Sequence, residues 1–260
     1  NEERDKLIRT LDDIGALYGV VPPTQRMSLF EMEPSYFFGH DIMMFHTKNP
    51  LSSPFGQIFK RGMDVIISSL ALFMLSPVIL TVSAMLKIEG QGGSLFYGGE
   101  RIGKNGKRFK CWKFRSMEPN SDHLLEALLD LDPGARKEWE TYRKLKRPDP
   151  RITTRTANII RKTSIDELPQ LWNVLKGDMS LIGPRPILQN EVYLYGDSIR
   201  QYLRVRPGIT GIWLVSGRNS TSFKRRIYWD NWYIRNWSLW GDIVILLKTL
   251  RVVLDRSGAY

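Results

Sequence analysis

The sequence holds very little of what disulfide frameworks, zinc sites and hydrolase triads require. Its single cysteine, Cys111, excludes an intrachain disulfide and is compatible with a reducing compartment. The three histidines, His40, His46 and His123, lie in unrelated contexts, so the sequence shows neither a Cys/His zinc spacing nor a Ser/His/Asp arrangement. Chemistry in this chain is therefore expected to depend on carboxylates and cations.

Acidic residues are also in the minority. The chain of 260 residues carries 38 Lys and Arg against 27 Asp and Glu, which gives a formal net charge of +11. Such an excess of cations indicates an anionic partner: nucleic acid, anionic lipid or a phosphorylated substrate. The length allows one substantial domain, or a domain with appendages.

One segment lacks charge completely. Residues 65–86 stay apolar for about 22 residues, which is long enough to span a bilayer. Ser76 and Pro77 lie near the middle, where a proline removes a helical hydrogen bond and kinks the helix. Lys and Arg flank both ends, and the positive-inside rule places both flanks in the cytoplasm. These features favour a re-entrant helix over 58–87 with a break at Ser76-Pro77, rather than a spanning helix or a buried core helix.

Residues 161–186, RKTSIDELPQLWNVLKGDMSLIGPRP, carry the densest set of chemically useful side chains. Pro169 is tolerated only in the first turn of a helix, so a helix is expected to begin near Asp166 and to end at Gly177. Asp166 and Glu167 would then lie at the positive end of the helix dipole, which favours anions and keeps Asp166 ionised. Two adjacent acids framed by cations suit phosphoryl chemistry.

The same residues also fit a structural role. Ser164, followed three residues later by Glu167, matches a capping box outright. Acids are commonplace at helix starts, so from these residues alone a helix cap is the more common explanation than a catalytic pair.

The longer run resembles the bacterial sugar transferases, the monotopic phosphoglycosyl transferases. Their motif holds an Asp-Glu dyad followed by Leu-Pro-Gln, then Asn-Val-Leu-x-Gly-Asp-Met-Ser and Gly-Pro-Arg-Pro; it stands here as DELPQ, NVLKGDMS and GPRP. KFRSM at 113–117, DPRIT at 149–153 and RPGITGI at 206–212 match further family segments. The resemblance therefore runs from about Phe59 to the C-terminus.

The resemblance implies transfer of a hexose 1-phosphate from a UDP-sugar to undecaprenyl phosphate with release of UMP. Galactose 1-phosphate is the favoured hexose phosphate. This transfer initiates O-antigen or exopolysaccharide assembly. Asp166 would be the nucleophile that forms a covalent aspartyl phosphosugar, Glu167 would assist it, and both would hold Mg²⁺. The phosphates would be held by Arg161, Arg185, Lys113, Arg115 and Arg218. The residues themselves do not distinguish galactose from glucose or an N-acetylated sugar.

This chain departs from the family pattern at two places. Ala157 and Asn158 stand where a glycine and an arginine are usual, which puts the shape of a loop there in question. Leu214 replaces a glutamine. The glycines at 208, 211 and 217, with Arg218, could form a nucleotide-holding loop, although structural turns explain these glycines nearly as well.

The expected architecture is an α/β catalytic domain over residues 88–260. It would contain a β-hairpin over 94–117 that turns at Asn105-Gly106 and two amphipathic helices over 121–131 and 133–145. Aromatic residues recur at helical spacing in 223–254 and suit either a core or an interfacial belt; they are Trp229, Tyr233, Trp237 and Trp240.

The remaining segments are assigned by the resemblance. Residues 1–48 would be the C-terminal part of a Rossmann-like accessory domain of a longer chain, and 49–57 a linker. The re-entrant helix and interfacial helices would hold this monotopic protein in membrane lipids, on the cytoplasmic face of the bacterial inner membrane. No nucleic acid is expected as a partner, and homo-oligomerisation stays open.

Two alternatives compete with this interpretation. A non-catalytic basic membrane- or nucleic-acid-binding module would show salt-sensitive binding to any polyanion and no UMP release. In the other alternative the protein is the same enzyme, but it transfers the sugar phosphate by direct displacement, without a covalent intermediate.

Overall fold

The computed structural model describes residues 10, 32–36, 43–47, 53–90, 93–118, 121–142, 145, 151–216 and 222–254. The chain divides into two compact units, Asn1–Lys48 and Asn49–Tyr260. In the first unit β1 (Met32–Tyr36) pairs antiparallel with β2 (Met43–Thr47). The assignment of residues 1–48 to an accessory domain and of 49–57 to a linker stays a prediction.

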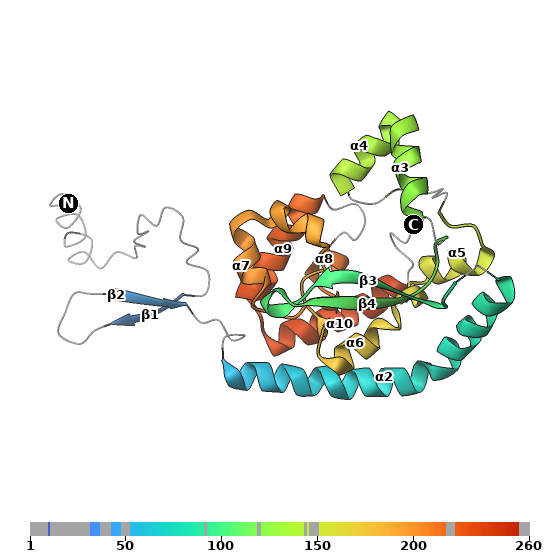
Figure 1. Ribbon diagram of the computed structural model, residues 1–260. Coiled ribbons are helices and arrows are strands. Elements are labelled where there is room, and N and C mark those ends of the chain that lie inside the picture. Colours follow the sequence, from blue (N-terminus) through green and yellow to red (C-terminus); the bar gives the residue numbers. More distant parts are fainter. Residues whose placement is uncertain are drawn as a thin grey trace. The chain divides into compact units, whose positions relative to one another are not determined.

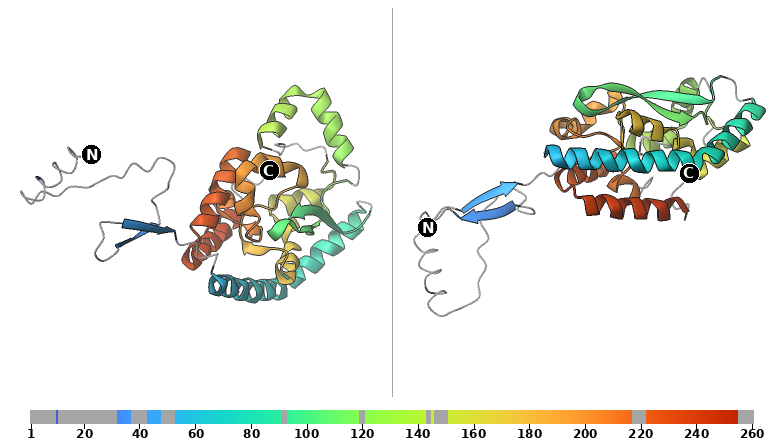
Figure 2. Two further views of the ribbon diagram at one scale, coloured as in Figure 1. Left: turned by 60° about the vertical axis from the view of Figure 1, so that its left-hand side comes forward. Right: turned by 90° about the horizontal axis from the view of Figure 1, so that it is seen from below.

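The second unit mixes helices with two small sheets, in agreement with the expected α/β class (Figure 1). The long helix α2 (Pro54–Glu89) runs along one side, between the β3–β4 hairpin and α10 when seen from below (Figure 2). The other elements are β3 (Phe96–Ile102), η2 (Lys104–Gly106), β4 (Arg108–Phe114), α3 (Ser121–Leu131), α4 (Pro133–Tyr142), α5 (Arg155–Lys162), η3 (Ile165–Glu167), α6 (Gln170–Lys176), β5 (Ser180–Ile182), η4 (Gln189–Ser198), α7 (Ile199–Tyr202), β6 (Gly208–Thr210), α8 (Ile212–Val215), α9 (Phe223–Arg235) and α10 (Leu239–Leu254).

The hairpin forms where the sequence predicts it. β3 and β4 pair antiparallel, and the turn between them contains Asn105 at φ 58° and Gly106 at φ 76°. Asparagine and glycine tolerate these left-handed conformations better than other residues, which explains the turn. Phe109 and Cys111 of β4 point into the core, and Lys113 follows them at the same two-residue spacing.

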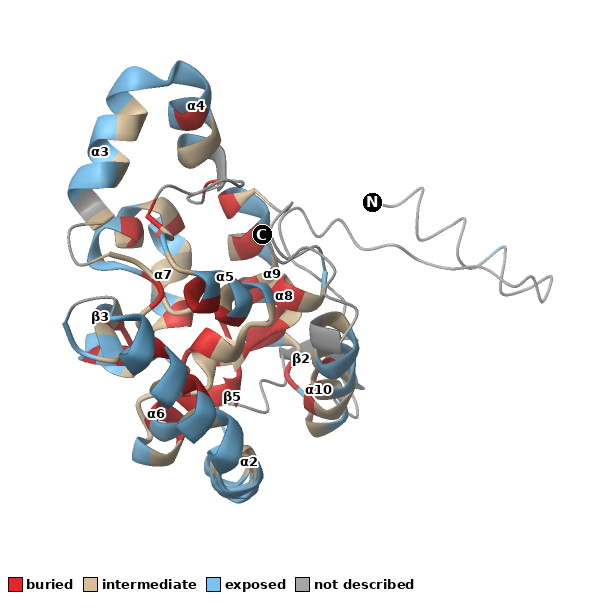
Figure 3. Ribbon diagram, turned by 90° about the vertical axis from the view of Figure 1, so that its right-hand side faces the viewer, coloured by how far each residue is buried: buried red, intermediate tan, exposed pale blue. Residues whose placement is uncertain are grey.

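The main core lies between the hairpin, α2, α6, β5 and the last two helices. Its buried members are Phe109, Cys111, Leu171, Val174, Met179, Leu181, Ile182, Val205, Tyr233, Ile234, Trp237 and Ile245. Figure 3 shows the buried residues gathering on these inner elements, whereas α2, α3 and α4 are mostly exposed. The α3–α4 pair stands away from this core (Figures 1 and 2).

The apolar segment forms one continuous helix, so the break expected at Ser76-Pro77 is a bend and not an interruption. α2 changes direction partway along (Figure 1), and Pro77 is the proline inside it. The carbonyl of Phe73 would normally accept from the N–H that Pro77 lacks. Instead it accepts a hydrogen bond of 2.8 Å from the hydroxyl of Ser76, which explains why serine precedes the proline.

Among the described residues, α2 is the one helix whose length and composition suit a bilayer crossing, and only 11% of its most apolar stretch is buried. The exposed side chains of α2 include Phe73, Met74, Leu80 and Ile88. Its buried side chains are instead largely polar in the first half, where Lys60, Asp64 and Ser68 follow one another at four-residue spacing. A helix in water shows the opposite distribution.

The C-terminal region with helical periodicity forms two helices, α9 and α10. The aromatic stripe divides between them: Tyr233 and Trp237 are buried in the core, Trp229 is half-buried, and Trp240 is 71% exposed. Packing in the core therefore accounts for Tyr233 and Trp237. A role at a membrane interface stays a prediction for Trp240.

Two glycines of the suspected nucleotide-holding loop have structural roles. A Cβ on Gly208 would lie 2.1 Å from the backbone nitrogen of Gly183, and a Cβ on Gly211 would lie 2.3 Å from the Gly183 carbonyl oxygen. Both glycines are therefore required by the close packing of β6 against the segment after β5. Gly217 and Arg218 lie outside the described residues, so the predicted role of Arg218 has no structural test here.

Candidate active site

The Asp-Glu dyad lies in a 3₁₀ turn before α6 and not in the first turn of that helix, so the expected helix start near Asp166 is wrong. Pro169 lacks the N–H that the carbonyl of Ile165 would need in an α-helix. The carbonyl accepts from the N–H of Leu168 at 3.1 Å, which tightens the chain into η3, and α6 begins at Gln170. Gly177, at φ 89°, ends α6 as predicted.

The capping-box hypothesis is also wrong. Ser164 has a left-handed conformation at φ 59°, and its side chain makes no capping hydrogen bond. The segment before it, with Ala157 and Asn158, forms helix α5 rather than the expected loop, and Ala157 is fully buried. The dyad is thus held between two short helices, and helix capping does not explain its acids.

Asp166 is nearly enclosed, with 9% of its surface exposed. Burial raises the pKa of its carboxyl to about 6; the neighbouring Glu167 charge adds to the rise, and Lys113 and Arg161 oppose it. The expected effect of a helix dipole does not govern this carboxyl, because Asp166 lies outside α6 and burial raises its pKa. At neutral pH the carboxylate is still largely ionised and is poorly solvated.

Glu167 pairs with a cation from the hairpin. The Nζ of Lys113 donates to Oε1 of Glu167 at 2.6 Å, and both side chains are about one-third exposed. Burial lowers the pKa of Lys113, but the charges of Glu167 and Asp166 outweigh that effect and raise it. Lys113 is therefore a cation fixed beside both carboxylates, and its role at the substrate phosphates stays a prediction.

Arg161 completes this group from the last turn of α5. Its charge opposes the rise in the pKa of Asp166, so it lies within electrostatic range of that carboxylate. The structure thus brings together four predicted site residues from β4, α5 and η3: Lys113, Arg161, Asp166 and Glu167.

Arg185 lies on the loop after β5, and its backbone is fixed from two sides. The Asp230 carboxylate of α9 accepts from its N–H, and the Tyr202 hydroxyl donates to its carbonyl at 3.1 Å. Its half-buried side chain acts electrostatically on the Cys111 thiol, as do Lys113 and Glu167. Arg185 is therefore within electrostatic range of the part of β4 that carries Cys111.

Arg226 and Asp230 are site-supporting residues that the sequence analysis missed. Burial, and then the charge of Arg185, lower the pKa of Arg226 to about 10. Burial raises the pKa of Asp230 to about 7, against the opposing effects of Tyr195, Arg185 and Arg226. At helical spacing in α9 these positions look like ordinary polar residues, and only the fold brings them to Arg185.

Arg115 is held by residues at the start of the hairpin. Its Nε donates to the carbonyl of Ser94 at 2.7 Å, and its guanidinium lies 5.9 Å from the centre of the Tyr97 ring. These contacts hold Arg115 at the end of the hairpin where Lys113 pairs with Tyr97, and its role at the substrate phosphates stays a prediction.

Asn173 is a second missed residue. Its side-chain amide donates to the carbonyl of Lys110 at 2.8 Å and accepts from the N–H of Trp112 at 2.9 Å. A fully buried amide thereby joins α6 to the edge of β4 and fixes the dyad turn relative to Lys113. In the sequence, Asn173 falls on the same face of the helix as Leu171 and Val174. A polar residue on that apolar face could have indicated a buried hydrogen-bonding role.

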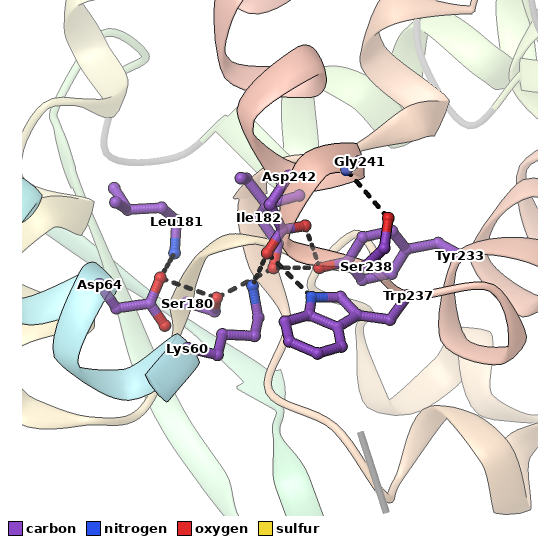
Figure 4. A network of polar contacts seen from close by, with 10 residues as sticks. All are labelled: Lys60, Asp64, Ser180, Leu181, Ile182, Tyr233, Trp237, Ser238, Gly241 and Asp242. Carbon is purple, nitrogen blue, oxygen red and sulfur yellow. Dashed lines mark hydrogen bonds and ion pairs between the residues drawn. The ribbon is translucent and has the colours of Figure 1, made fainter. Parts of the chain in front are cut away.

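The polar stripe of α2 forms a third missed set (Figure 4). Lys60 donates to Asp242 of α10 at 2.7 Å, and Asp242 also accepts from Tyr233 at 2.9 Å and from Trp237 at 2.9 Å. Asp64 accepts from the hydroxyl of Ser180 and from the backbone N–H of Leu181. This network attaches α2 to α10 and β5.

A magnesium ion at the dyad would need ligands besides the two carboxylates. Among the described residues no group of three or more His, Cys, Asp or Glu side chains could hold a metal. Mg²⁺ in phosphoryl-transfer sites commonly takes only one or two carboxylates and fills its other positions with water and substrate phosphate. Asp166 and Glu167 supply two adjacent carboxylates of that kind.

Comparisons with known proteins agree with the motifs. Residues 55–256 match the family model described as bacterial sugar transferase. Undecaprenyl-phosphate galactose phosphotransferase of Salmonella typhimurium is 48% identical over 241 residues, which cover 93% of this chain and 50% of that protein. UDP-galactose-lipid carrier transferase of Erwinia amylovora is 43% identical over 261 residues, which cover 100% of this chain and 54% of that protein.

A shorter relative matches most of this chain and nearly all of its own length. Exopolysaccharide production protein ExoY of Sinorhizobium fredii is 48% identical over 207 residues, which cover 80% of this chain and 90% of that protein. The chain thus spans about half the length of the Salmonella and Erwinia relatives and nearly all of the shorter one. On the family model and on these relatives, the chain belongs to the bacterial sugar transferase family.

Proposed function

We propose that this chain is the catalytic part of a phosphoglycosyl transferase that moves galactose 1-phosphate from UDP-galactose to undecaprenyl phosphate. The observation that carries the proposal is the enclosed Asp166 carboxylate, set beside Glu167 and the cations Lys113 and Arg161. The names of the Salmonella and Erwinia relatives support the lipid and the sugar nucleotide as substrates. The ExoY relative supports a role in exopolysaccharide assembly, and the same transfer would initiate O-antigen assembly.

In the first step an oxygen of the Asp166 carboxylate attacks the phosphorus that bears galactose. The bond from that phosphorus to the bridging oxygen breaks, UMP leaves with the electron pair, and an aspartyl phosphogalactose remains. In the second step an anionic oxygen of undecaprenyl phosphate attacks the same phosphorus. The bond to Asp166 breaks, and undecaprenyl diphosphogalactose leaves with the carboxylate restored.

The cations around the dyad suit the charge that this reaction develops. Lys113 and Arg161 flank the carboxylates, and Arg185 is aimed by a backbone that Asp230 and Tyr202 hold in place. Fixed donors of this kind stabilise a transferring phosphoryl group without rearranging during the reaction. Glu167 would handle protons or position phosphate, since Lys113 holds its carboxylate close to Asp166. Mg²⁺, held by Asp166 and Glu167, would neutralise the diphosphate of the UDP-sugar and the charge that develops on the departing UMP.

The membrane part of the proposal rests on α2 and on exposed apolar side chains of other helices. α2 exposes its apolar residues and buries its polar ones, which suits lipid on the outside. Trp172 of α6 and Trp240 of α10 are also exposed, and tryptophan favours the membrane interface. We propose a re-entrant α2 on the cytoplasmic face of the inner membrane, where a soluble sugar nucleotide and a lipid phosphate can meet.

The function is tested by UMP release from a panel of UDP-sugars, with and without undecaprenyl phosphate and Mg²⁺. We expect UDP-galactose to give turnover only when the lipid is present. Without lipid, wild-type enzyme should release about one UMP per active site and retain the sugar phosphate, a mass shift that intact-protein mass spectrometry detects. The alternative of a basic binding module predicts no UMP from any sugar nucleotide.

The covalent intermediate has its own test. Asp166→Asn should abolish both the burst of UMP and the adduct, because an amide does not displace UMP. Glu167→Gln should form the adduct slowly, since the nucleophile remains in place. An adduct that persists in Asp166→Asn would remove Asp166 from the nucleophile's role. Lipid-dependent turnover without any adduct, followed by rapid quench, would favour direct displacement.

A further inference from the structure

A second group of cations lies at the far end of the hairpin from the dyad. A small cavity there, with a volume of about 30 Å³, is lined by residues of α2, the hairpin turn and the segment between α7 and β6. We call it the basic pocket; its charged lining residues are Lys60, Asp64, Lys104, Arg204 and Arg206.

The basic pocket is separate from the active site. Lys104 is in the turn at one end of β4, and Lys113 is near the other end. A strand rises by about 3.3 Å per residue, so the two lysines are on the order of 20 Å apart along the hairpin. A ligand in the basic pocket would therefore not touch Asp166 or Glu167.

Three of the cations in the basic pocket form no ion pair with a described residue. Lys60 is paired with Asp242. Asp64 accepts from the neutral donors Ser180 and Leu181 and keeps its negative charge, so the four cations of the lining still outnumber Asp64 and Asp242. Among the described residues no carboxylate lies within ion-pair distance of the remaining cations, Lys104, Arg204 and Arg206.

The partners of these cations are neutral groups. Lys104 donates to the amide oxygen of Gln57 at 3.0 Å, and the Nε of Arg206 donates to the carbonyl of Gly177 at 2.8 Å. Such hydrogen bonds fix the side chains but leave their charges in place, and a guanidinium has further donors to offer. Burial, and then the charge of Arg206, lower the pKa of Lys104, which shows that the positive charges are crowded. An anion would relieve this crowding.

The surroundings of the basic pocket indicate which kind of anion it would bind. The basic pocket lies against the first turns of α2, where the large apolar side chains Phe55 and Ile58 are 78% and 71% exposed. Cations beside an apolar exposed surface at the start of a membrane helix are placed at the level of lipid headgroups. The cavity has room for about two waters, which is enough for two oxygens of a phosphate whose remainder lies outside the cavity, and it is too small for a nucleoside.

We propose that the basic pocket binds an anionic phosphate group, supplied by the headgroup of an acidic phospholipid at the membrane surface. Lys104, Arg204 and Arg206 would contact the phosphate oxygens, and Phe55 and Ile58 would lie against the acyl chains. This lipid would be distinct from the lipid substrate and would hold the hairpin turn to the membrane, far from the reacting phosphorus.

Native mass spectrometry of the full chain in neutral detergent tests the proposal. The probes are phosphatidylglycerol, phosphatidylcholine (whose phosphate is balanced by its own choline) and inorganic phosphate. We expect one phosphatidylglycerol to bind about tenfold more tightly than phosphatidylcholine, as the loss of one charged hydrogen bond implies. Arg204→Gln should lose most of that preference, and Lys104→Gln with Arg204→Gln should lose all of it.

Arg200→Gln is the matched control. Arg200 is exposed on α7, one helical turn before Arg204, and does not line the basic pocket. The Arg200→Gln substitution removes one positive charge from the same segment as Arg204→Gln. The Arg200→Gln protein should therefore bind phosphatidylglycerol as the wild type does. Melting temperatures without lipid report folding; Arg204 is exposed, so Arg204→Gln should melt normally.

Competition with inorganic phosphate distinguishes the sources of the anion. Displacement of the lipid only at high phosphate concentrations supports the headgroup. Tight binding of inorganic phosphate, lost in Arg204→Gln, with no preference for phosphatidylglycerol, would overturn the lipid source. Equal binding of the two phospholipids, with no effect of Arg204→Gln in any arm, would overturn the site itself.

Discussion

The ion pair between Lys113 and Glu167 allows a test of the electrostatic part of the mechanism at the scale of a single residue. Lys113→Met keeps the length of the side chain and removes its charge, which leaves two carboxylates facing an anionic substrate. We expect kcat/KM for UDP-galactose to fall by about 100-fold, the usual effect of losing one preorganised donor. Steady-state UMP release measures the change.

Lys110→Met is the control for that substitution. Lys110 lies on the same strand, but its side chain is exposed on the other face. It should retain wild-type kinetics, because no catalytic group is near it. Equal loss in both variants would mean that overall positive charge, and not the Lys113 position, supports the reaction.

Asp230 allows a prediction about pH. Its folded pKa of about 7 lies above the value near 4 expected for an unfolded chain, so the folded state holds its proton more tightly. Raising the pH from about 4 to 7 therefore destabilises the wild type through this group, by up to about 1.4 kcal/mol per pH unit. Above pH 7 the cost stays constant.

The side chain of Asp230→Asn does not titrate. A comparison of this variant with the wild type therefore isolates the pH dependence of stability that Asp230 causes. The difference in melting temperature, variant minus wild type, should grow as the pH rises from 4 to 7 and should then level off. The KM for UDP-galactose should rise as well, because the weaker amide acceptor holds the backbone of Arg185 less firmly. A melting difference that stays the same at every pH would show that Asp230 titrates normally.

The residues of the dyad could be predicted from the sequence, but their supports could not. Asp166, Glu167 and Arg161 stand within six positions of one another, and a motif presents them together. Asn173 contacts Lys110 across 63 positions, and Lys60 contacts Asp242 across 182. No local pattern contains such pairs, because the fold decides which polar residues meet.

At the scale of elements, Pro77 determines the shape of α2. Pro77→Ala restores a backbone hydrogen bond and should straighten the helix, which displaces Val82 and Leu86 from their packing against Phe114 and Ile160. Because small displacements at an active site are costly, UMP release should fall by about 10- to 100-fold. The chain should still be extracted and purified in detergent as the wild type is.

Ser76→Ala is the companion to that variant. It removes the hydroxyl that satisfies the Phe73 carbonyl but keeps the proline, so the bend should remain and most activity with it. Wild-type turnover in Pro77→Ala would show that the bend is not needed for the reaction.

The elements that were predicted well are those with local causes. The hairpin depends on Asn105 and Gly106, whose left-handed conformations define the turn by themselves. The start of α6 was misjudged because Pro169 is compatible both with a first helical turn and with the residue before it. The backbone of Ile165 and Leu168 selected the second arrangement, and packing of Ala157 and Ile160 formed α5 where a loop was expected.

At the scale of the whole molecule, α2 buries polar side chains of its first half and apolar ones of its second half against its own domain, and it presents many apolar side chains outward. Lys60 and Asp64 bind α10 and β5, while Val82 and Leu86 pack against β4 and α5, so both halves of the helix are attached to one compact unit. A helix that crossed the bilayer would carry its second half away from that unit. The attachment of both halves is therefore the argument for a re-entrant path.

Cysteine labelling tests this path in membrane vesicles of known orientation. Ser53→Cys and Ser94→Cys place exposed thiols just before and just after α2. Cys111→Ala is the better background, because Cys111 is buried in the apolar core, where a serine hydroxyl would lack a partner. An impermeant maleimide should label both thiols from the cytoplasmic side and neither from outside. Opposite labelling of the two positions would contradict re-entry, because it requires α2 to cross the bilayer and the contacts at one of its ends to break.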